Sequence, residues 1–187
     1  GSGRQIAHNL GVVPELCIIK PTSATGDWQT TLPNKGFLLT TTAAAANNGN
    51  ATHFTDSYIT PLGAGVTTTP NTGGTSYNAY LFATLAGISK VFQYTGNGAS
   101  QTINCGFAAG ARFILIKRAD AVGDWFIWDS ARGIVDGNDP RLSTNTSSAE
   151  VTTDDSVDPH ASGFIVNQVA ATNINVTDAV YVGFAIA

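Results

Sequence analysis

The residues best suited to acid–base or nucleophilic chemistry lie in the second half of the sequence. Segment 129–133, DSARG, brings an Asp, a Ser and an Arg together, but no His lies near it in the sequence. The chain contains no GxSxG nucleophile elbow and no glycine-rich phosphate-binding loop. The sequence therefore predicts a protein without catalytic activity. The alternative, a glycan-degrading enzyme, requires two carboxylates about 5–10 Å apart in a groove. The candidates for that pair are Asp124, Asp129, Glu150 and Asp155.

The histidines and the clustered acidic residues lack the spacing of a metal site. The histidines are His8, His53 and His160. Two ligands on one face of an element would need to be two or four residues apart, and these are not. The densest acidic stretch contains Glu150, Asp154, Asp155 and Asp158. Carboxylates of this kind can bind calcium, but the spacing matches no calcium loop. We interpret the stretch as a solvated acidic loop and expect no metal and no cofactor.

Two GDW triplets, at 26–28 and 123–125, recur where a turn is expected to lead into a strand. Gly permits positive φ, Asp can bond to its own backbone and Trp buries a large area, so both triplets are interpreted as structural. Lys20 and Lys117 end equivalent strands, and each is expected to form an ion pair or to extend its stem along apolar surface. Exposed aromatic rings can also stack on sugars. The candidates for such a glycan-binding surface are Trp28, Tyr58, Tyr77 and Trp128.

The composition of the 187 residues excludes several other classes of protein. Charged residues make up 12%, hydrophobic residues 43%, and the net charge is −4. A disordered chain would contain fewer apolar residues, and a coiled coil would contain more Glu and Lys. The nine basic residues are scattered, which argues against nucleic-acid binding. No apolar run is long enough to span a membrane, and the sequence carries no signal peptide.

The cysteines and the missing methionine bear on how the chain is made. Cys17 and Cys105 lie beside apolar residues, which favours buried free thiols over a single disulfide. The absence of Met indicates a fragment, a processed product or a tagged product. The first three residues fit either a cloning remnant or the start of a repeat, and Ala187 fits a natural domain end.

An internal repeat organises the sequence. CIIKPTSATGDW at 17–28 aligns with ILIKRADAVGDW at 114–125, at an offset of 97 residues. The ends align as well, since SYNAYLFA at 76–83 matches VYVGFAIA at 180–187. The sequence therefore predicts two copies of one unit joined by a short connector. The boundaries are 1–86 for the first unit, 87–93 for the connector and 94–187 for the second unit.

Each copy is expected to consist of short strands. Apolar, β-branched runs at 15–20 and 112–117 predict buried strands. Segments 27–32 and 124–129 follow Gly-containing turns and predict hairpins. The large side chains at 125–128 indicate a strand covered on both faces, whereas the more polar counterpart at 28–32 is expected to be partly exposed. Further strands are expected at 37–41, 54–60 and 163–169 and at the aromatic end of each copy.

Helical periodicity is almost absent, so the predicted fold class is all-β. We expect a jelly-roll-like or concanavalin-like antiparallel β-sandwich built from two tandem repeats. The pattern allows two separate sandwiches, one for each copy, or one larger double sheet that both copies share.

The second copy resembles a poorly characterised repeat domain of phage tail and tail-fibre proteins. It carries five short motifs in the order of that repeat, namely ILIK at 114–117, DSARG at 129–133, LSTN at 142–145, SGF at 162–164 and YVGFAIA at 181–187. The resemblance covers nearly all of 95–187. In the first copy it is partial, because TTLPNKG at 30–36 lacks the Asp, Ser and Arg of the DSARG motif.

The resemblance implies a virion component on a tail or fibre, located extracellularly, and it implies no catalytic residues. We expect a non-catalytic structural or host-surface-binding module that assembles with itself, most simply as a trimer, or with other virion proteins. A host surface glycan is a further candidate partner, whereas nucleic acid and membrane insertion are not expected. The alternative is a carbohydrate-binding β-sandwich module of a secreted bacterial protein.

Overall fold

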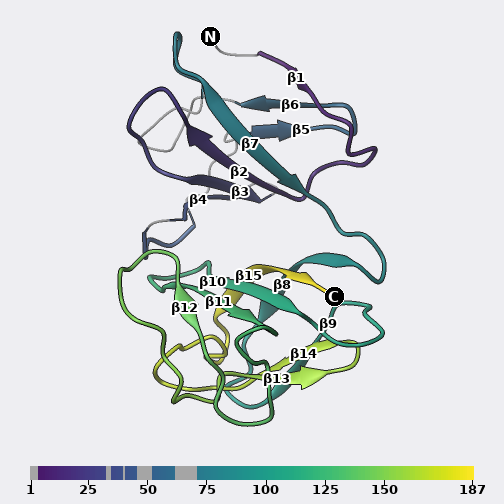
Figure 1. The fold of residues 1–187 in the computed structure, drawn as a ribbon, viewed down its shortest axis with the longest axis vertical. Coiled ribbons are helices and arrows are strands. Elements are labelled where there is room, and N and C mark those ends of the chain that lie inside the picture. Colours follow the sequence, from purple (N-terminus) through teal and green to yellow (C-terminus); the bar gives the residue numbers. More distant parts are fainter. Residues whose placement is uncertain (1–3, 33–34, 40, 46–51, 62–70) are drawn as a thin grey trace. The chain divides into compact units, whose positions relative to one another are not determined.

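The computed structural model describes residues 4–32, 35–39, 41–45, 52–61 and 71–187. Strands and turns account for the regular structure of these residues, and no helix occurs among them (Figure 1). The all-β prediction is confirmed. The chain divides into two compact units. Unit 1 comprises Gly1–Thr40 and Ala45–Ala83, and unit 2 comprises Thr41–Ala44 and Thr84–Ala187.

Unit 1 contains two antiparallel sheets. Its strands are β1 (Ile6–Ala7), β2 (Leu16–Pro21), β3 (Gln29–Leu32), β4 (Lys35–Leu38), β5 (Thr52–Phe54), β6 (Tyr58–Pro61) and β7 (Tyr77–Phe82). One sheet has the order β4-β3-β2-β7 and the other β1-β6-β5. Cys17 and Ile19 on β2 pack with Ile59 on β6 in a small buried core. Alternation along β2 therefore directs its odd-numbered side chains toward the second sheet.

Unit 2 also contains two antiparallel sheets. Its strands are β8 (Ser89–Thr95), β9 (Gln101–Asn104), β10 (Phe113–Arg118), β11 (Trp125–Asp129), β12 (Leu142–Ser143), β13 (Val157–His160), β14 (Gly163–Val166) and β15 (Val180–Ile186). The sheet orders are β12-β11-β10-β15-β8 and β13-β14-β9, and Figure 1 shows β15 between β10 and β8. Ile116 and Trp128 of one sheet share a large buried core with Phe164 of the other. Each unit thus forms its own β-sandwich.

The strand pairing of unit 1 recurs in unit 2. Cys17 pairs with Thr31, and Ile114 pairs with Trp128, so both partners differ by the offset of 97 residues. The closing strands follow the same scheme, because Cys17 pairs with Leu81 and Ile114 with Ala185. The β1-β6-β5 order also matches β9-β14-β13. These equivalences support the interpretation of the chain as two tandem copies.

The expected single strand at 54–60 is wrong, because a turn divides it into β5 and β6. Thr55 N donates to Tyr58 O at 3.0 Å. The Thr55 hydroxyl accepts hydrogen bonds from Ser57 N at 3.3 Å and Tyr58 N at 2.9 Å. A Thr side chain that bonds locally to the backbone competes with strand pairing. The strand expected at 163–169 is shorter than predicted, because β14 ends at Val166.

Residues 87–93 are not a connector, since most of them belong to β8. This strand pairs with β15 over seven residue pairs, from Ser89 with Ile186 to Thr95 with Val180. The prediction of a partly exposed strand at 28–32 is wrong for β3, because all four of its residues are buried, whereas Trp28 before it is half-buried. The prediction of a strand covered on both faces at 125–128 agrees with the structure, because Ile127 is the only one of these four residues that is not buried.

Gly183 allows β15 to pack tightly between its two neighbours. It is paired with Phe92 of β8 and with Ile116 of β10. A Cβ at this position would overlap the carbonyl oxygen of Leu115 and the ring of Phe92. Adding one methyl group here therefore requires a shift of backbone or of a buried ring.

We expect Gly183→Ala to lower the free energy of unfolding of unit 2 by about 1–3 kcal/mol, as overpacking of a core does. Urea denaturation followed by tryptophan fluorescence measures the loss. Gly73→Ala is the matched control, because a Cβ there would meet no atom within 4 Å. An equal loss in the two variants would contradict the prediction.

Candidate functional site

An aromatic pair and a lysine occupy the outer face of the larger sheet of unit 1. The rings of Trp28 and Tyr80 stack with centroids 6.2 Å apart and an interplanar angle of 28°. Lys20 Nζ lies 5.6 Å from the centroid of the Trp28 ring. Tyr80 is 45% exposed, and Trp28 is half-buried. We call Lys20, Trp28 and Tyr80 the Trp28 face. It combines aromatic surface with a cation and is accessible in unit 1.

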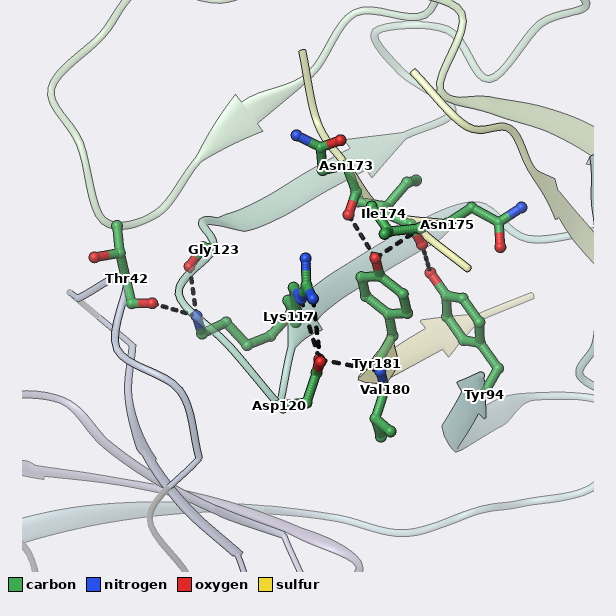
Figure 2. Close-up of polar contacts among 12 residues, drawn as sticks. Thr42, Tyr94, Lys117, Asp120, Gly123, Asn173, Ile174, Asn175, Val180 and Tyr181 are labelled. Carbon is green, nitrogen blue, oxygen red and sulfur yellow. Dashed lines mark hydrogen bonds and ion pairs between the residues drawn. The ribbon is translucent and has the colours of Figure 1, made fainter. Parts of the chain in front are cut away.

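The counterparts of the Trp28 face in unit 2 are Lys117, Trp125 and Phe184, and all three are buried. Residues of the Thr41–Ala44 segment cover this end of the sheet, because Thr42 O accepts a hydrogen bond from Lys117 Nζ at 2.9 Å (Figure 2). Thr42 O also accepts a hydrogen bond from Gly123 N at 2.9 Å. Burial lowers the pKa of Lys117 to about 8, and the nearby Asp124 carboxylate only partly opposes this change.

Each of the two lysines donates a hydrogen bond to the turn that precedes β3 or β11. Lys20 Nζ donates to Gly26 O at 2.5 Å, and Lys117 Nζ donates to Gly123 O. The expectation of an ion pair or a stem along apolar surface missed this hydrogen bond, which fastens the GDW turn to the preceding strand in both units. The structural interpretation of the GDW triplets is consistent with this arrangement.

The four predicted glycan-stacking residues do not form a row. Trp128 is 0% exposed in the core of unit 2, so the prediction that its ring serves as a surface platform is wrong. Tyr77 packs against the core of unit 1, and Tyr58 lies in the other sheet, paired with Ala7. Trp28 alone contributes to an accessible aromatic pair. Its partner Tyr80 was not among the candidates, although alternation along the strand YNAYLF places Tyr80 on the opposite face of the strand from Tyr77.

A cavity of about 590 Å³ lies between the two sheets of unit 1, beside β7. Its apolar walls include Ile19, Ile59, Tyr77, Ala79 and Leu81. In unit 2, the aromatic core fills the equivalent space with Phe92 and its neighbours. The difference arises at the sheet edge, because among the described residues no strand lies beside β7 as β8 lies beside β15. Such a cavity is large enough to receive side chains of a ligand.

Two tyrosines, Tyr94 on β8 and Tyr181 on β15, attach these neighbouring strands to the loop that precedes β15 (Figure 2). The rings of Tyr94 and Tyr181 stack with centroids 4.9 Å apart. Tyr94 Oη donates to Ile174 O at 2.5 Å, and Tyr181 Oη donates to Asn173 O at 2.6 Å. Burial raises the pKa of both phenols, so both remain neutral donors at physiological pH.

The carboxylates proposed for glycan hydrolysis have structural partners. Arg132 forms ion pairs with both Asp129 and Glu150, the second with Nε and Oε1 2.9 Å apart. Asp129 Oδ1 also accepts from Ala131 N at 3.0 Å, which closes the DSARG turn. Asp124 accepts from Asn145 Nδ2 at 2.7 Å, whereas Asp155 accepts from Asn167 Nδ2 at 3.0 Å. The structure thus brings Asp129 and Glu150 together through one guanidinium.

The interpretation of 150–158 as a solvated acidic loop is wrong for Asp154. This carboxylate is buried against Arg141, with Nη2 and Oδ2 2.8 Å apart, and it also accepts from Ser156 Oγ at 2.9 Å. The guanidinium of Arg141 lies 4.7 Å from the centroid of the Phe126 ring. A buried charge requires such partners, so this ion pair is part of the unit-2 core.

Asp139 is a second buried carboxylate, and among the described residues it forms no ion pair with a cation. It accepts hydrogen bonds from Val135 N at 2.9 Å and Val157 N at 3.3 Å. Burial raises the pKa of Asp139 to about 7, and the negative charges of Asp158 and Asp155 add to this effect. No sequence motif identified this residue, because its burial depends on the tertiary fold.

The raised pKa of Asp139 predicts a pH-dependent stability. The folded state holds the proton more tightly than the unfolded chain, so this group destabilises the fold increasingly as pH rises from about 4 to 7. We expect Asp139→Asn to reduce the fall in melting temperature over this range, as measured by circular dichroism. Asp136→Asn, which removes an exposed carboxylate from the same loop, separates burial from loss of charge. An identical pH dependence in wild type and Asp139→Asn would refute the assignment.

The cysteines are free and buried, as expected. Burial raises the pKa of Cys17 to about 12 and that of Cys105 to about 11. Among the described residues, no group of three His, Cys, Asp or Glu side chains could hold a metal ion. No helix in the described ranges is long and apolar enough to cross a membrane.

Comparison with known proteins identifies the family. No curated protein and no solved structure matches the chain. A family model described as a domain of unknown function (DUF7483) matches residues 1–187. The match covers both units and therefore the full pair of β-sandwiches. The chain accordingly belongs to the DUF7483 family.

Proposed function

We propose that the chain is a non-catalytic structural or host-surface-binding module of a phage tail fibre or another virion appendage. The observation that carries the proposal is the Trp28 face, which is accessible in unit 1 while its counterpart in unit 2 is covered. Aromatic surface that is half-exposed in an isolated chain is typical of association sites. The ordered motifs of the second copy, which resemble those of phage tail repeats, indicate the kind of assembly.

In this proposal the Trp28 face contacts another copy of the chain in a homo-oligomer, with a trimer as the favoured state. The low charge of the chain agrees with such packing, because few lysines are available to prevent association of strand edges. The location would be the virion, outside the host cell.

A direct test of the virion assignment uses a phage whose genome encodes a DUF7483 domain. We expect mass spectrometry of purified tails to detect tryptic peptides of the domain in a fixed ratio to the major tail proteins. The matched control is a non-structural protein of the same phage. Recovery of the domain only from the soluble fraction of the lysate would overturn the proposal.

The second candidate, a carbohydrate-binding module, is favoured by the stacked Trp28 and Tyr80 rings, because an aromatic face can carry a sugar ring. Lys20 beside them could hydrogen-bond or pair with an acidic sugar. The two candidate functions differ in what covers the Trp28 face, which is another copy of the chain in the first and a glycan in the second.

The double variant Trp28→Ala with Tyr80→Ala distinguishes the two candidates. If the face joins subunits, sedimentation equilibrium should give the mass of an oligomer for the wild type and of one chain for the variant. Val122→Ala is the control, because it removes an apolar side chain that is 70% exposed elsewhere. A wild-type monomer that binds glycans on an array, with binding lost in the double variant, would favour the carbohydrate-binding module.

A further inference from the structure

We propose that the outer edge of β7 binds an added β-strand of another polypeptide, and that this strand carries two aromatic side chains two positions apart. The inference rests on the assembly role proposed above and specifies a surface and a partner for it. In the part of the chain that the structure describes, β7 pairs with β2 alone and forms the edge of its sheet.

The corresponding edge in unit 2 shows what such a strand contributes. There β8 runs antiparallel to β15 and sends two rings into the core. Phe92 meets Phe164 edge-on with ring centroids 5.5 Å apart, and Tyr94 stacks on Tyr181. One strand therefore supplies both the backbone partners of the edge and a large part of the aromatic core.

The backbone of β7 is oriented to accept a partner in the same way. Ser76 O and Phe82 O accept hydrogen bonds from Thr22 N and Glu15 N at 2.8 Å each, so even-numbered residues of β7 bond toward β2. In an antiparallel strand the alternate residues then direct their N–H and C=O groups to the opposite side. Ala79 and Leu81 occupy these positions, as Gly183 and Ala185 do on β15.

The cavity beside β7 provides the space for the two rings. Ile59 and Tyr77 stand in its wall where Phe164 and Tyr181 contact Phe92 and Tyr94 in unit 2. Tyr77 Oη accepts a hydrogen bond from Thr72 N at 3.1 Å, as Tyr181 Oη in unit 2 accepts one from Val176 N at 3.0 Å. The smaller Ile59 leaves more room for an incoming ring than Phe164 would.

A polar group at the end of the cavity continues the equivalence. Asn71 lines the cavity, and its Nδ2 donates to Pro61 O at 3.4 Å. Asn175 in unit 2 donates to Val166 O at 3.3 Å in the same way. Asn175 Oδ1 also accepts from Asn97 N at 3.0 Å, on the segment that follows β8. Asn71 therefore occupies the position in unit 1 that Asn175 occupies in unit 2.

A strand of another polypeptide fits these features better than a small ligand does. Main-chain bonds to a sheet edge supply affinity, and pockets for alternate side chains supply specificity. The sequence of β7, YNAYLF, contains no charge of the kind that usually protects an exposed edge. Aromatic residues on the incoming strand would pack against the apolar wall of the cavity, formed by Ile19, Ile59 and Leu81, as aromatic residues fill the core of unit 2.

The probe for this site is a fluorescein-labelled, amidated peptide with the sequence ISKVFQYTGN of residues 88–97. Fluorescence anisotropy with the full chain should show saturable binding. The same peptide with Phe92→Ala and Tyr94→Ala should bind at least tenfold more weakly. Hydrogen exchange should slow at the amides of Ala79 and Leu81 when the unsubstituted peptide is bound.

Two variants at one position separate this site from others. Ala79→Pro removes an outward N–H at a place where an edge strand tolerates proline, so peptide affinity should fall at least tenfold. Ala79→Gly introduces the residue that unit 2 has opposite Phe92, so affinity should rise severalfold. Hydrogen exchange of β2 amides in the absence of peptide verifies that unit 1 is folded in each variant.

Three results would overturn the inference. One is the absence of peptide binding to a chain whose unit 1 is folded. Another is binding that Ala79→Pro leaves unchanged, which would place the peptide elsewhere, for example in exchange with β8. The third is a wild-type dimer that Ala79→Pro dissociates, since the occupant would then be a second copy of β7. None of these measurements uses virions, so their failure is distinguishable from failure of the virion assignment.

Discussion

The pairing of each unit's last strand with the first strand of its hairpin, β7 with β2 and β15 with β10, is the interaction on which the fold depends. In unit 2 this pairing joins Phe113 on β10 to Ile186 on β15, residues far apart in the sequence. Closing so long a loop costs conformational entropy, which only extensive burial can offset. Burial of five consecutive residues of β15, from Tyr181 to Ala185, offsets this loss of conformational entropy. The alternation of these two strands then decides which side chains face the second sheet.

The same constraint has different outcomes in the two units because the side chains differ. Large aromatic residues on β11 and β14 allow unit 2 to build a continuous core around β15. In unit 1, Gln29 and Thr31 occupy the corresponding inward positions, and both are buried without adding comparable apolar bulk. The sheet order is therefore retained, while the described residues of unit 1 form a smaller apolar core than those of unit 2.

Local sequence patterns predicted the strands whose ends are set by residues close to them in the sequence. The hairpin of β10 and β11 was predicted to within one residue at each end, because β-branched runs and a Gly-containing turn define it. The role of 87–93 could not be predicted in this way, because β8 is identified by pairing with a strand about ninety residues later. The repeat also concealed it, since a segment placed between two copies was interpreted as a connector.

The candidate sites followed the same division. Trp28 was identified from its residue type and its turn, whereas Trp128 has the same residue type in a strand whose burial depends on a second sheet. Asp139 and Asp154 depend on neighbours that only the folded chain brings close, namely backbone amides for the first and Arg141 for the second. Charge density in the sequence therefore said little about which carboxylates are in contact with water.

The two buried thiols have a consequence for the covalent history of the chain. A thiolate is the form that attacks disulfides and oxidants, and burial keeps both Cys17 and Cys105 protonated at neutral pH. Each sulfur is enclosed in the core of a different unit. The folded chain thus keeps the same covalent structure in reducing and oxidising surroundings, and it can be made in one and used in the other without a redox step.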